Sequence, residues 1–390
     1  MGMWDRTFRH LGETLADDQR RRVLIGRLGR WLKRSVLILS LLCLVMLLSV
    51  VLVHRWVGEN NVTVAAMLYL PRQGWLILPA LLFPLALLIH RPSAALLLAG
   101  SGLFVLFGMG YRLAGAPVAP SATANPGELT ILTYNRGQHM NQSLQPFKEA
   151  TLPDLIAFQE AAGRAKRYLG AEGYEDLPHV ADTGEFTLLS KFPILSAQRL
   201  DIEVDGTVQR PAARFEIDFA GQPVAVYSVH VASPRGTLLS YRGGAFFYGV
   251  VGYFGTPWEE HRLAHQRYWD GRITTTRKIL DLIDQEQIPT LVIGDFNAPS
   301  GGYIHGAVVE RLGDAHREVG QGFGFTFPGK TSNPLSLGGP WIRIDYIFFP
   351  RSNWEPLWCL TEPDRTSQHR AVAARFRLIA PSEDDKGATD

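Results

Sequence analysis

The first third of the chain is dominated by long apolar runs, whereas later apolar runs are short. Residues 35–53 contain no charged side chain, and a helix rising about 1.5 Å per residue would carry them across a hydrocarbon layer of roughly 30 Å. Residues 74–89 and 93–110 are apolar too, and the second of these holds small residues such as Ala95 and Gly102 that favour close helix packing. We therefore expect three membrane-spanning helices within residues 35–112. A cleaved signal peptide and a buried soluble hairpin are the alternatives.

Basic residues before the first apolar run predict its orientation. Residues 1–34 hold nine Lys and Arg against four Asp and Glu, which favours a cytoplasmic N-terminus. Three crossings would then place the chain after Tyr111 outside the cytoplasm, with the protein in the inner or plasma membrane. Residues 62–70 are too few to cross as a helix, so we interpret them as interfacial or re-entrant. If they did cross, the later part of the chain would face the cytoplasm.

Short apolar runs predict a folded domain at residues 128–380. A stretch rich in proline and small residues, 113–127, precedes it as a linker, and the polar residues 381–390 follow it as a disordered tail. Apolar spacing predicts helices at residues 142–150 and 259–287. Alternating or continuous apolar runs predict strands at residues 128–135, 154–158, 186–189, 210–219, 223–231, 290–293, 341–349 and 371–379. Because strands and helices do not alternate regularly, we expect an α/β sandwich of layers rather than a doubly wound sheet or barrel.

The charge of this domain argues against a dedicated duplex-binding protein. Residues 128–380 hold 25 Lys and Arg against 28 Asp and Glu, a net charge of −3, whereas proteins that bind duplexes usually present a basic surface. A local basic patch remains compatible with this total. The chain has two cysteines, Cys43 and Cys359, which are too few for a zinc cluster.

Carboxylate and amide side chains follow two of the predicted strands directly. Glu160 comes just after residues 154–158, and Asp295 and Asn297 come just after residues 290–293. Strand ends are where layered α/β domains place their chemistry, and oxygen ligands suit Mg²⁺. Two residues apart on an extended chain, Asp295 and Asn297 can point the same way. The alternatives are an exposed charge at Glu160 and an ordinary turn at Asp295 and Asn297.

Two histidines are candidates for proton transfer, since imidazole titrates near neutrality. His369 needs an orienting partner, and Asp345, flanked by apolar residues in a strand, is a carboxylate that needs one. His230 ends the strand at residues 223–231 and would bind or protonate a phosphate. Asn135 ends the first strand and would position a metal-bound water or a phosphate oxygen. Each of these residues alone is equally well explained as a packed core or turn residue.

Taken together, these ordered motifs resemble those of the endonuclease/exonuclease/phosphatase superfamily. This superfamily includes pancreatic-type deoxyribonuclease, abasic-site nucleases, neutral sphingomyelinases and inositol-phosphate phosphatases. The resemblance spans about residues 128–380. It implies a four-layer α/β sandwich and phosphoester hydrolysis that depends on Mg²⁺ (or Mn²⁺), with the site at one edge of two packed sheets.

The resemblance also implies roles for individual residues. Asn135 and Glu160 would belong to the metal site, and His230 would contact the scissile phosphate. Asp295 and Asn297 would hold or activate water and phosphate, while Asp345 would orient His369. The list of candidate substrate ligands is completed by Arg235, which follows the His230 strand.

One position departs from the superfamily pattern. The superfamily usually has Ser-Asp-His at its last motif, and this chain has Ser367-Gln368-His369. Gln368 offers a carbonyl oxygen to a metal but no charge, which lowers the expected metal affinity. A catalytically weak or inactive binding module is therefore an alternative to an active enzyme.

A glycine-rich aromatic insert indicates the class of substrate. Residues 237–258 hold seven aromatic residues and one charged residue, and aromatic side chains favour membrane interfaces. With the apolar helices, the insert favours a membrane lipid as partner and a lipid-linked phosphate or pyrophosphate as substrate. The architecture is similar to that of glycopeptide-resistance-type membrane phosphatases, thought to act on polyprenyl pyrophosphate. The alternatives are a nuclease acting on nucleic acid outside the cytoplasm and an insert that only covers the domain's own core.

Overall fold

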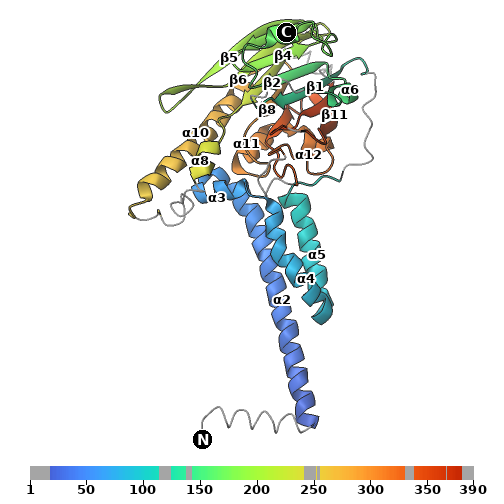
Figure 1. Cartoon of the computed structure of the whole chain (residues 1–390), viewed down its shortest axis with the longest axis vertical. Coiled ribbons are helices and arrows are strands. Elements are labelled where there is room, and N and C mark those ends of the chain that lie inside the picture. Colours follow the sequence, from blue (N-terminus) through green and yellow to red (C-terminus); the bar gives the residue numbers. More distant parts are fainter. Residues whose placement is uncertain are drawn as a thin grey trace, which may run out of the picture. The chain divides into compact units, whose positions relative to one another are not determined.

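The computed structural model describes residues 18–113, 124–137, 143–240, 252, 255–329, 338–365 and 367–379. It divides into two compact units, and the second is discontinuous in sequence. The first unit contains the described part of Met1–Val51 together with Arg72–Gly108. The second contains Leu52–Pro71 together with the described part of Met109–Asp390. Figure 1 shows that the early part of the chain is helical and that the strands all lie in the later part.

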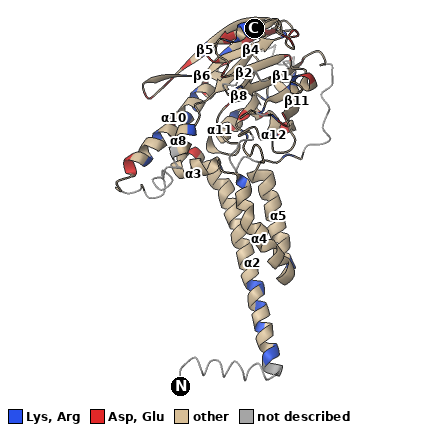
Figure 2. Cartoon of the chain, viewed as in Figure 1, with Lys and Arg blue, Asp and Glu red and all other residues tan. Residues whose placement is uncertain are grey.

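Three segments of the chain form helices long and apolar enough to cross a membrane: Arg21–Trp56, Arg72–Ile89 and Arg91–Gly108. These segments comprise helix α2 (Asp18–Trp56), the 3₁₀ helix η2 (Arg72–Leu76), α4 (Ile77–Ile89), α5 (Arg91–Leu103) and the π-helix η3 (Phe104–Gly108). Figure 2 shows that the Lys and Arg residues of α2 gather in its first turns, while α4 and α5 hold almost no charged residues. The expected apolar helices are therefore present.

Within the first unit, the helices pack through a small cluster of buried side chains: Val36, Cys43, Ala86, Ala94 and Leu97. The closest approach is at Gly100, where a β-carbon would lie 1.9 Å from Cδ2 of Leu44. Ala95 and Gly102, which we expected at the helix contact, are exposed instead. The reason is helical periodicity, because Ala94, Leu97 and Gly100 share the face that α5 turns inward.

The second unit is built on two six-stranded sheets. The first sheet has the order β11 (Trp354–Thr361), β12 (Val372–Leu378), β1 (Glu128–Asn135), β2 (Leu155–Gln159), β4 (Phe186–Ser190), β3 (His179–Thr183). The second has the order β5 (Ile194–Val204), β6 (Thr207–Phe219), β7 (Gln222–His230), β8 (Thr290–Asp295), β10 (Asp345–Phe349), β9 (Gly313–Asp314). Only β1 with β2 and β7 with β8 pair in parallel among these strands.

The described helices of this unit are mostly short, and one is long. Their bounds are η1 (Gly58–Asn60), α3 (Val62–Leu68), α6 (Phe147–Thr151), α7 (Ala165–Tyr168), α8 (Arg235–Ser240), α10 (Glu259–Ile283), α11 (Tyr303–Arg311) and α12 (Ala315–Val319). The helix expected at residues 142–150 is thus only the short α6, and the long helix expected at residues 259–287 is α10.

Alternation along the strands creates a sandwich of four layers. Leu129 and Ile131 of β1 join the apolar core between the two sheets, whereas Leu132 and Tyr134 face the opposite side. On that outer side they pack in one cluster with α6 and α7. The outer face of the second sheet packs against α10 and α11 in a third cluster. The expected four-layer α/β sandwich is confirmed.

Two predicted segments differ in the structure. The strand expected at residues 341–349 begins only at Asp345, because Ile342 instead forms an isolated bridge with Phe327. Residues 62–70, which we interpreted as interfacial or re-entrant, form α3 within the second unit, where Val62 and Ala65 pack against Trp269 of α10. Residues 114–123 of the linker, residues 241–251 of the insert and the tail lie outside the described residues.

Candidate active site

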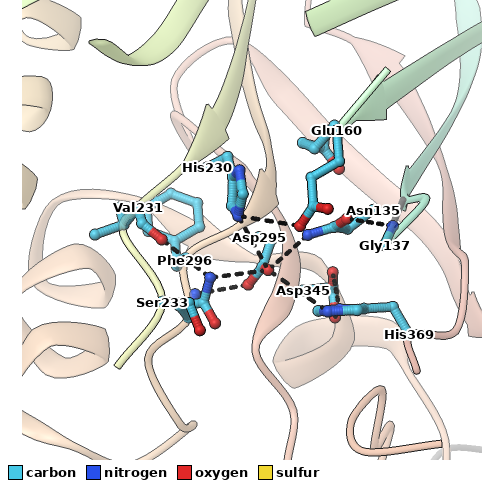
Figure 3. A network of polar contacts seen from close by, with 12 residues as sticks. Asn135, Gly137, Glu160, His230, Val231, Ser233, Asp295, Phe296, Asp345 and His369 are labelled. Carbon is cyan, nitrogen blue, oxygen red and sulfur yellow. Dashed lines mark hydrogen bonds and ion pairs between the residues drawn. The ribbon is translucent and has the colours of Figure 1, made fainter. Parts of the chain in front are cut away.

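Strand pairing brings the predicted site residues to one edge of the two sheets. Asn135 pairs with Gln159 where β1 and β2 end, and His230 pairs with Asp295 where β7 and β8 end. Asp345 opens β10 directly opposite Asp295. Figure 3 shows side chains from both sheets pointing toward one another around Asp295. The motifs that are far apart in the sequence therefore form one cluster.

Asp295 is the centre of this cluster and is fully buried. Its Oδ2 accepts hydrogen bonds from Nδ2 of Asn135 at 3.0 Å and from Nδ2 of Asn297 at 3.0 Å. Nε2 of His230 and Nε2 of His369 each lie 3.8 Å from the same oxygen. Its Oδ1 accepts the backbone N–H of Asn297 at 2.7 Å. One carboxylate thus organises residues from β1, β7, the loop after β8 and the segment before β12.

The predicted Asp345–His369 pair is present. Nδ1 of His369 lies 3.1 Å from Oδ2 of Asp345, and both side chains are buried. Thr326 fixes the other end of this pair, because its hydroxyl oxygen accepts the backbone N–H of Asp345 at 3.2 Å. The His369 ring also lies against Phe327, with ring centroids 5.0 Å apart. Asp345 therefore orients the imidazole so that its Nε2 faces Asp295.

His230 is held in a similar way by a carboxylate that sequence reasoning did not identify. Its Nδ1 lies 3.0 Å from Oε1 of Glu185, and its Nε2 lies 3.8 Å from Oε1 of Glu160. Two histidines therefore face Asp295, each with a carboxylate on its other ring nitrogen. This arrangement places both Nε2 atoms where they can contact a bound substrate.

Charge in this buried site shifts the proton affinity of all three central groups. Burial alone would lower the pKa of His369, but the charges of Asp345 and Asp295 outweigh it and raise the pKa to about 9. Burial likewise lowers the pKa of His230, and Glu185 with Asp295 reverses the effect, again to about 9. Burial and the nearby charge of Asp345 raise the pKa of Asp295 to about 6.

The backbone around the site adopts conformations that most residues avoid. Glu160 has a φ of 51° and Asn297 a φ of 48°, both in the left-handed region. Gly294 has a φ of 127°, and a β-carbon there would lie 2.1 Å from the carbonyl oxygen of Val229. Strained residues persist only where surrounding contacts determine them, and such residues cluster at functional sites.

The donor set suits a divalent cation. Asp295, Asp345 and His369 each offer a ligand atom, and these atoms lie within 4.8 Å of one another. The Asp345–His369 hydrogen bond already explains part of that closeness. Glu160 is the half-buried carboxylate of the site, with 24 % of its side chain exposed, and therefore fits a hydrated ion better.

Two predicted residues lie apart from this network. The Gln368 side chain is exposed, between the buried residues Ser367 and His369, and its backbone oxygen accepts the N–H of Gly329 at 2.7 Å. Arg235 is exposed at the start of α8. The proposed roles of Gln368 at the metal and of Arg235 on the substrate therefore stay predictions without support from these positions.

Sequence reasoning missed several residues that support the site. Gln159 is fully buried and donates from Nε2 to the hydroxyls of Thr133 and Ser228, which joins the two sheets beneath Asp295. Its place beside Glu160 at a strand end was a usable signal. Glu185 gave no such signal, because it lies in the turn before β4 and meets His230 only in the folded chain.

Comparison with solved structures finds similar chains at low sequence identity. An endonuclease/exonuclease/phosphatase family protein from Bacteroides thetaiotaomicron is 14 % identical, with coverage of 66 % of this chain and 100 % of that chain and a TM-score of 0.46. Humanized D. rerio TDP2 is 17 % identical, with coverage of 64 % and 99 % and a TM-score of 0.43. The 3′ phosphatase NExo from Neisseria is 14 % identical, with coverage of 63 % and 98 % and a TM-score of 0.40. A search of curated proteins found no match.

The strongest comparison is with a family model. The model of the Endonuclease/Exonuclease/phosphatase family matches residues 137–369, which is more than half of the chain. The matched region contains Glu160, His230, Asp295 and Asp345 and ends at His369. This chain belongs to the Endonuclease/Exonuclease/phosphatase family.

Proposed function

We propose that the protein is a membrane-anchored, Mg²⁺-dependent phosphoester hydrolase that acts outside the cytoplasm on a lipid-linked phosphate or pyrophosphate. The observation that carries the hydrolase proposal is the convergence of Asn135, His230, Asn297 and His369 on the carboxylate of Asp295. A buried acid between two cationic histidines binds a phosphate and moves a proton, which are the two tasks of phosphoester hydrolysis.

The protonation states assign the roles. With a pKa of about 6, Asp295 is mostly ionised at neutral pH and accepts a proton from the attacking water. With pKa values of about 9, His230 and His369 are protonated. They bind the phosphate oxygens, and His369 donates its Nε2 proton to the leaving oxygen as the P–O bond breaks. Glu160 and Asn135 would hold Mg²⁺, which when bound neutralises phosphate charge.

The discontinuous second unit supports a location of the catalytic domain outside the cytoplasm. Leu52–Pro71 belongs to the same unit as the domain, so the two lie on the same side of any membrane. Residues 72–108 must then cross an even number of times, which two short apolar helices satisfy. The basic residues 1–34 favour a cytoplasmic N-terminus, and the first crossing puts Leu52–Pro71 and the domain outside.

The lipid-type substrate is proposed from charge and composition. The domain carries a net charge of −3, which does not favour a polyanion such as DNA. The aromatic insert at residues 237–258 follows the His230 strand and has the composition of a membrane-interface segment. An enzyme held at a membrane encounters lipid head groups at high local concentration.

A product-release assay on the full chain in detergent micelles tests the proposal. Polyprenyl pyrophosphate, sphingomyelin and DNA would be compared with Mg²⁺, with Mn²⁺ and with EDTA, and a His369→Ala variant would serve as the control. We expect turnover of a phospholipid-type substrate that EDTA abolishes. Preference for DNA would replace the proposal with a nuclease, and no turnover with any metal would indicate a binding module.

A further inference from the structure

The segment between the first two apolar helices contributes a polar network that the chemistry above does not use. Glu59 of this segment and Arg272 of α10 are buried within the second unit, and Tyr69 is half-buried there. Buried ionisable groups are costly unless they are paired and hydrogen-bonded. Their partners therefore indicate what the network does.

Tyr69 and Arg272 converge on one backbone carbonyl, that of Asn297. The Tyr69 hydroxyl donates to it at 2.5 Å, and Nη2 of Arg272 donates to it at 2.6 Å. Nη1 of Arg272 also donates to the Tyr69 hydroxyl at 3.1 Å, so the two donors brace each other. The guanidinium lies over the ring of Trp269, 5.1 Å from its centroid.

Glu59 holds the other end of the same loop. Residues 296–302 join β8 to α11, and the N-cap of α11 is Gly302, which has no side chain to accept a hydrogen bond. Oε2 of Glu59 instead accepts the backbone N–H groups of Tyr303 at 2.8 Å and Ile304 at 3.2 Å. An acceptor supplied from 244 residues away thus caps this helix.

The segment itself is anchored to the domain in three further places. The backbone N–H of Val62 donates to Oε1 of Gln266 at 2.9 Å, and Nε1 of Trp341 donates to the carbonyl oxygen of Tyr69 at 3.0 Å. Gly58 lies so close to α11 that a β-carbon there would be 2.7 Å from the backbone nitrogen of Tyr303. These contacts therefore hold Tyr69 in place, with its hydroxyl at the carbonyl oxygen of Asn297.

We call the hydrogen bonds of Tyr69 and Arg272 to the carbonyl oxygen of Asn297 the clamp. Asn297 is also the residue of this loop whose backbone conformation needs support. Asn297 has a left-handed backbone, and its side chain donates from Nδ2 both to Asp295 at 3.0 Å and to the carbonyl oxygen of Val231 at 3.0 Å. Its peptide orientation decides where that side chain points. The two donors on its carbonyl oxygen oppose rotation of this peptide. They therefore stabilise a left-handed backbone conformation that is otherwise unfavourable for a residue with a side chain.

We propose that Tyr69, braced by Arg272, is a positioning residue that fixes Asn297 for phosphate binding, so that the segment between the membrane helices is a working part of the active site. This inference rests on the proposed hydrolase chemistry. It assigns no contact with substrate to Tyr69 or Arg272. They act through the carbonyl oxygen of Asn297.

The test uses the full chain in detergent micelles with two probes. Bis(p-nitrophenyl) phosphate reports phosphodiester hydrolysis by its colour, and polyprenyl pyrophosphate reports pyrophosphate hydrolysis by the release of phosphate. Tyr69→Phe removes the hydroxyl and keeps the ring. We expect kcat to fall about tenfold while KM stays within about twofold, because displacement of a catalytic group by less than 1 Å is costly. The matched control is Tyr303→Phe, whose hydroxyl accepts from Arg277 on the surface. It should keep the wild-type kcat.

A double-mutant cycle separates positioning from general stabilisation. In an Asn297→Ala background, Tyr69→Phe should cause no further loss of kcat, because the group that it positions is gone. An equal loss in both backgrounds would overturn the proposal, as would a Tyr69→Phe variant with wild-type kcat.

Backbone hydrogen exchange tests the clamp when turnover is not observed. Amides in residues 296–302 of Tyr69→Phe should exchange about fivefold or more faster than in the wild type, and those of Tyr303→Phe should not. Unchanged exchange in this loop would refute the clamp. If the wild type shows no turnover but the loop exchanges faster in Tyr69→Phe, the hydrolase proposal is refuted and the clamp is still supported.

Discussion

Among the residues of the site, Asp295 and Asp345 have different roles because their hydrogen-bond partners differ. Both carboxylates are buried, yet Asp345 is hydrogen-bonded to His369 whereas Asp295 accepts from two amides. Asp345 therefore orients a neighbouring group, whereas Asp295 is the carboxylate on which the amides and histidines of the site converge. The two should respond differently to substitution.

Removal of either central group should abolish most activity. We expect Asp295→Ala and His369→Ala each to lower kcat by roughly a hundredfold or more, since positioned acid–base groups contribute that much. Steady-state kinetics on the proposed lipid substrate measures the loss. Asp284→Ala, an exposed residue that pairs with Arg311 at 2.9 Å, is the control and should leave kcat unchanged. A near-normal rate in either site variant would remove that residue from the mechanism.

A histidine away from the site should make stability depend on pH. Burial and the charge of Arg343 lower the pKa of His316 from 6.5 to about 4. The folded chain therefore binds fewer protons than the unfolded chain between these values, and stability falls as pH falls through that window. Since one pH unit is worth about 1.4 kcal/mol, the full effect is roughly 3 kcal/mol.

Thermal unfolding measured from pH 7 to pH 4.5 checks this expectation. His316→Gln removes the titrating group, so the variant should lose less stability than the wild type as the pH falls. Parallel curves for the two proteins would show that His316 does not contribute. Asp314, whose pKa the charge of Arg343 holds well below its usual value, and Arg112 also face this histidine electrostatically, and both are present in the wild type and in His316→Gln.

At the scale of elements, one distant carboxylate caps the helix that follows the catalytic loop. Glu59→Ala should leave the first N–H groups of α11 without their acceptor, and we expect a loss of about 1–2 kcal/mol in unfolding free energy. Differential scanning calorimetry in detergent measures it. Glu318→Ala, an exposed position on α12, should change stability by no more than a few tenths of a kcal/mol. Equal stability of Glu59→Ala and the wild type would show that the cap has no energetic role.

Strong apolar alternation made the central strands predictable. Residues 128–135 were predicted with the bounds that β1 has, because every second side chain enters the core between the sheets. β5 was missed since most of its side chains are exposed and its pattern is not apolar. β11 was missed because it contains Pro356 and a bulge between Pro356 and Trp358. An apolar pattern in the sequence arises from burial of side chains. Strands at the edges of a sheet are less buried, so their sequences show a weaker pattern.

The site was predictable for the same reason that its strands were. Asn135, His230 and Asp295 are at the ends of apolar strands, where sequence position alone indicates their place on the sheet edge. Asp345 was expected within the strand at residues 341–349, and only the structure shows that it opens β10 at the same edge. Glu185, Tyr69 and Arg272 are in turns or helices, and only long-range folding brings them to the site. A sequence pattern can therefore predict the central residues of a site. It does not predict the contacts from distant parts of the chain that hold those residues in place.

At the scale of the whole molecule, the catalytic unit is made from two separate stretches of chain. A chain beginning at residue 125 would lack Glu59 and Tyr69 and would expose the buried Trp269. We expect such a fragment to unfold at lower temperature and to lose most of its kcat. A chain in which a flexible linker replaces residues 72–108, and which begins at Leu52, should recover both. Equal stability and kcat for the two fragments would show that Leu52–Pro71 is dispensable.

The orientation of the molecule is testable in intact cells. A protease added outside should trim the catalytic domain and leave a fragment that contains residues 1–34. We expect this because the N-terminus is basic and because Leu52–Pro71 belongs to the same unit as the domain. Immunoblotting with tags at both ends of the chain detects the fragments. Complete protection of the C-terminal tag, with cleavage after the cells are permeabilised, would reverse the orientation.

The long separation between Tyr69 and Asn297 also sets an order of events during synthesis. The ribosome makes Tyr69 228 residues before its partner. Glu59, in η1, and Tyr69, just after α3, can therefore meet their partners only after the chain has been translated through the start of α11. We therefore expect the second unit to complete its folding only after that point of synthesis, and a chain that stalls before β8 should leave Tyr69 and Glu59 without these partners.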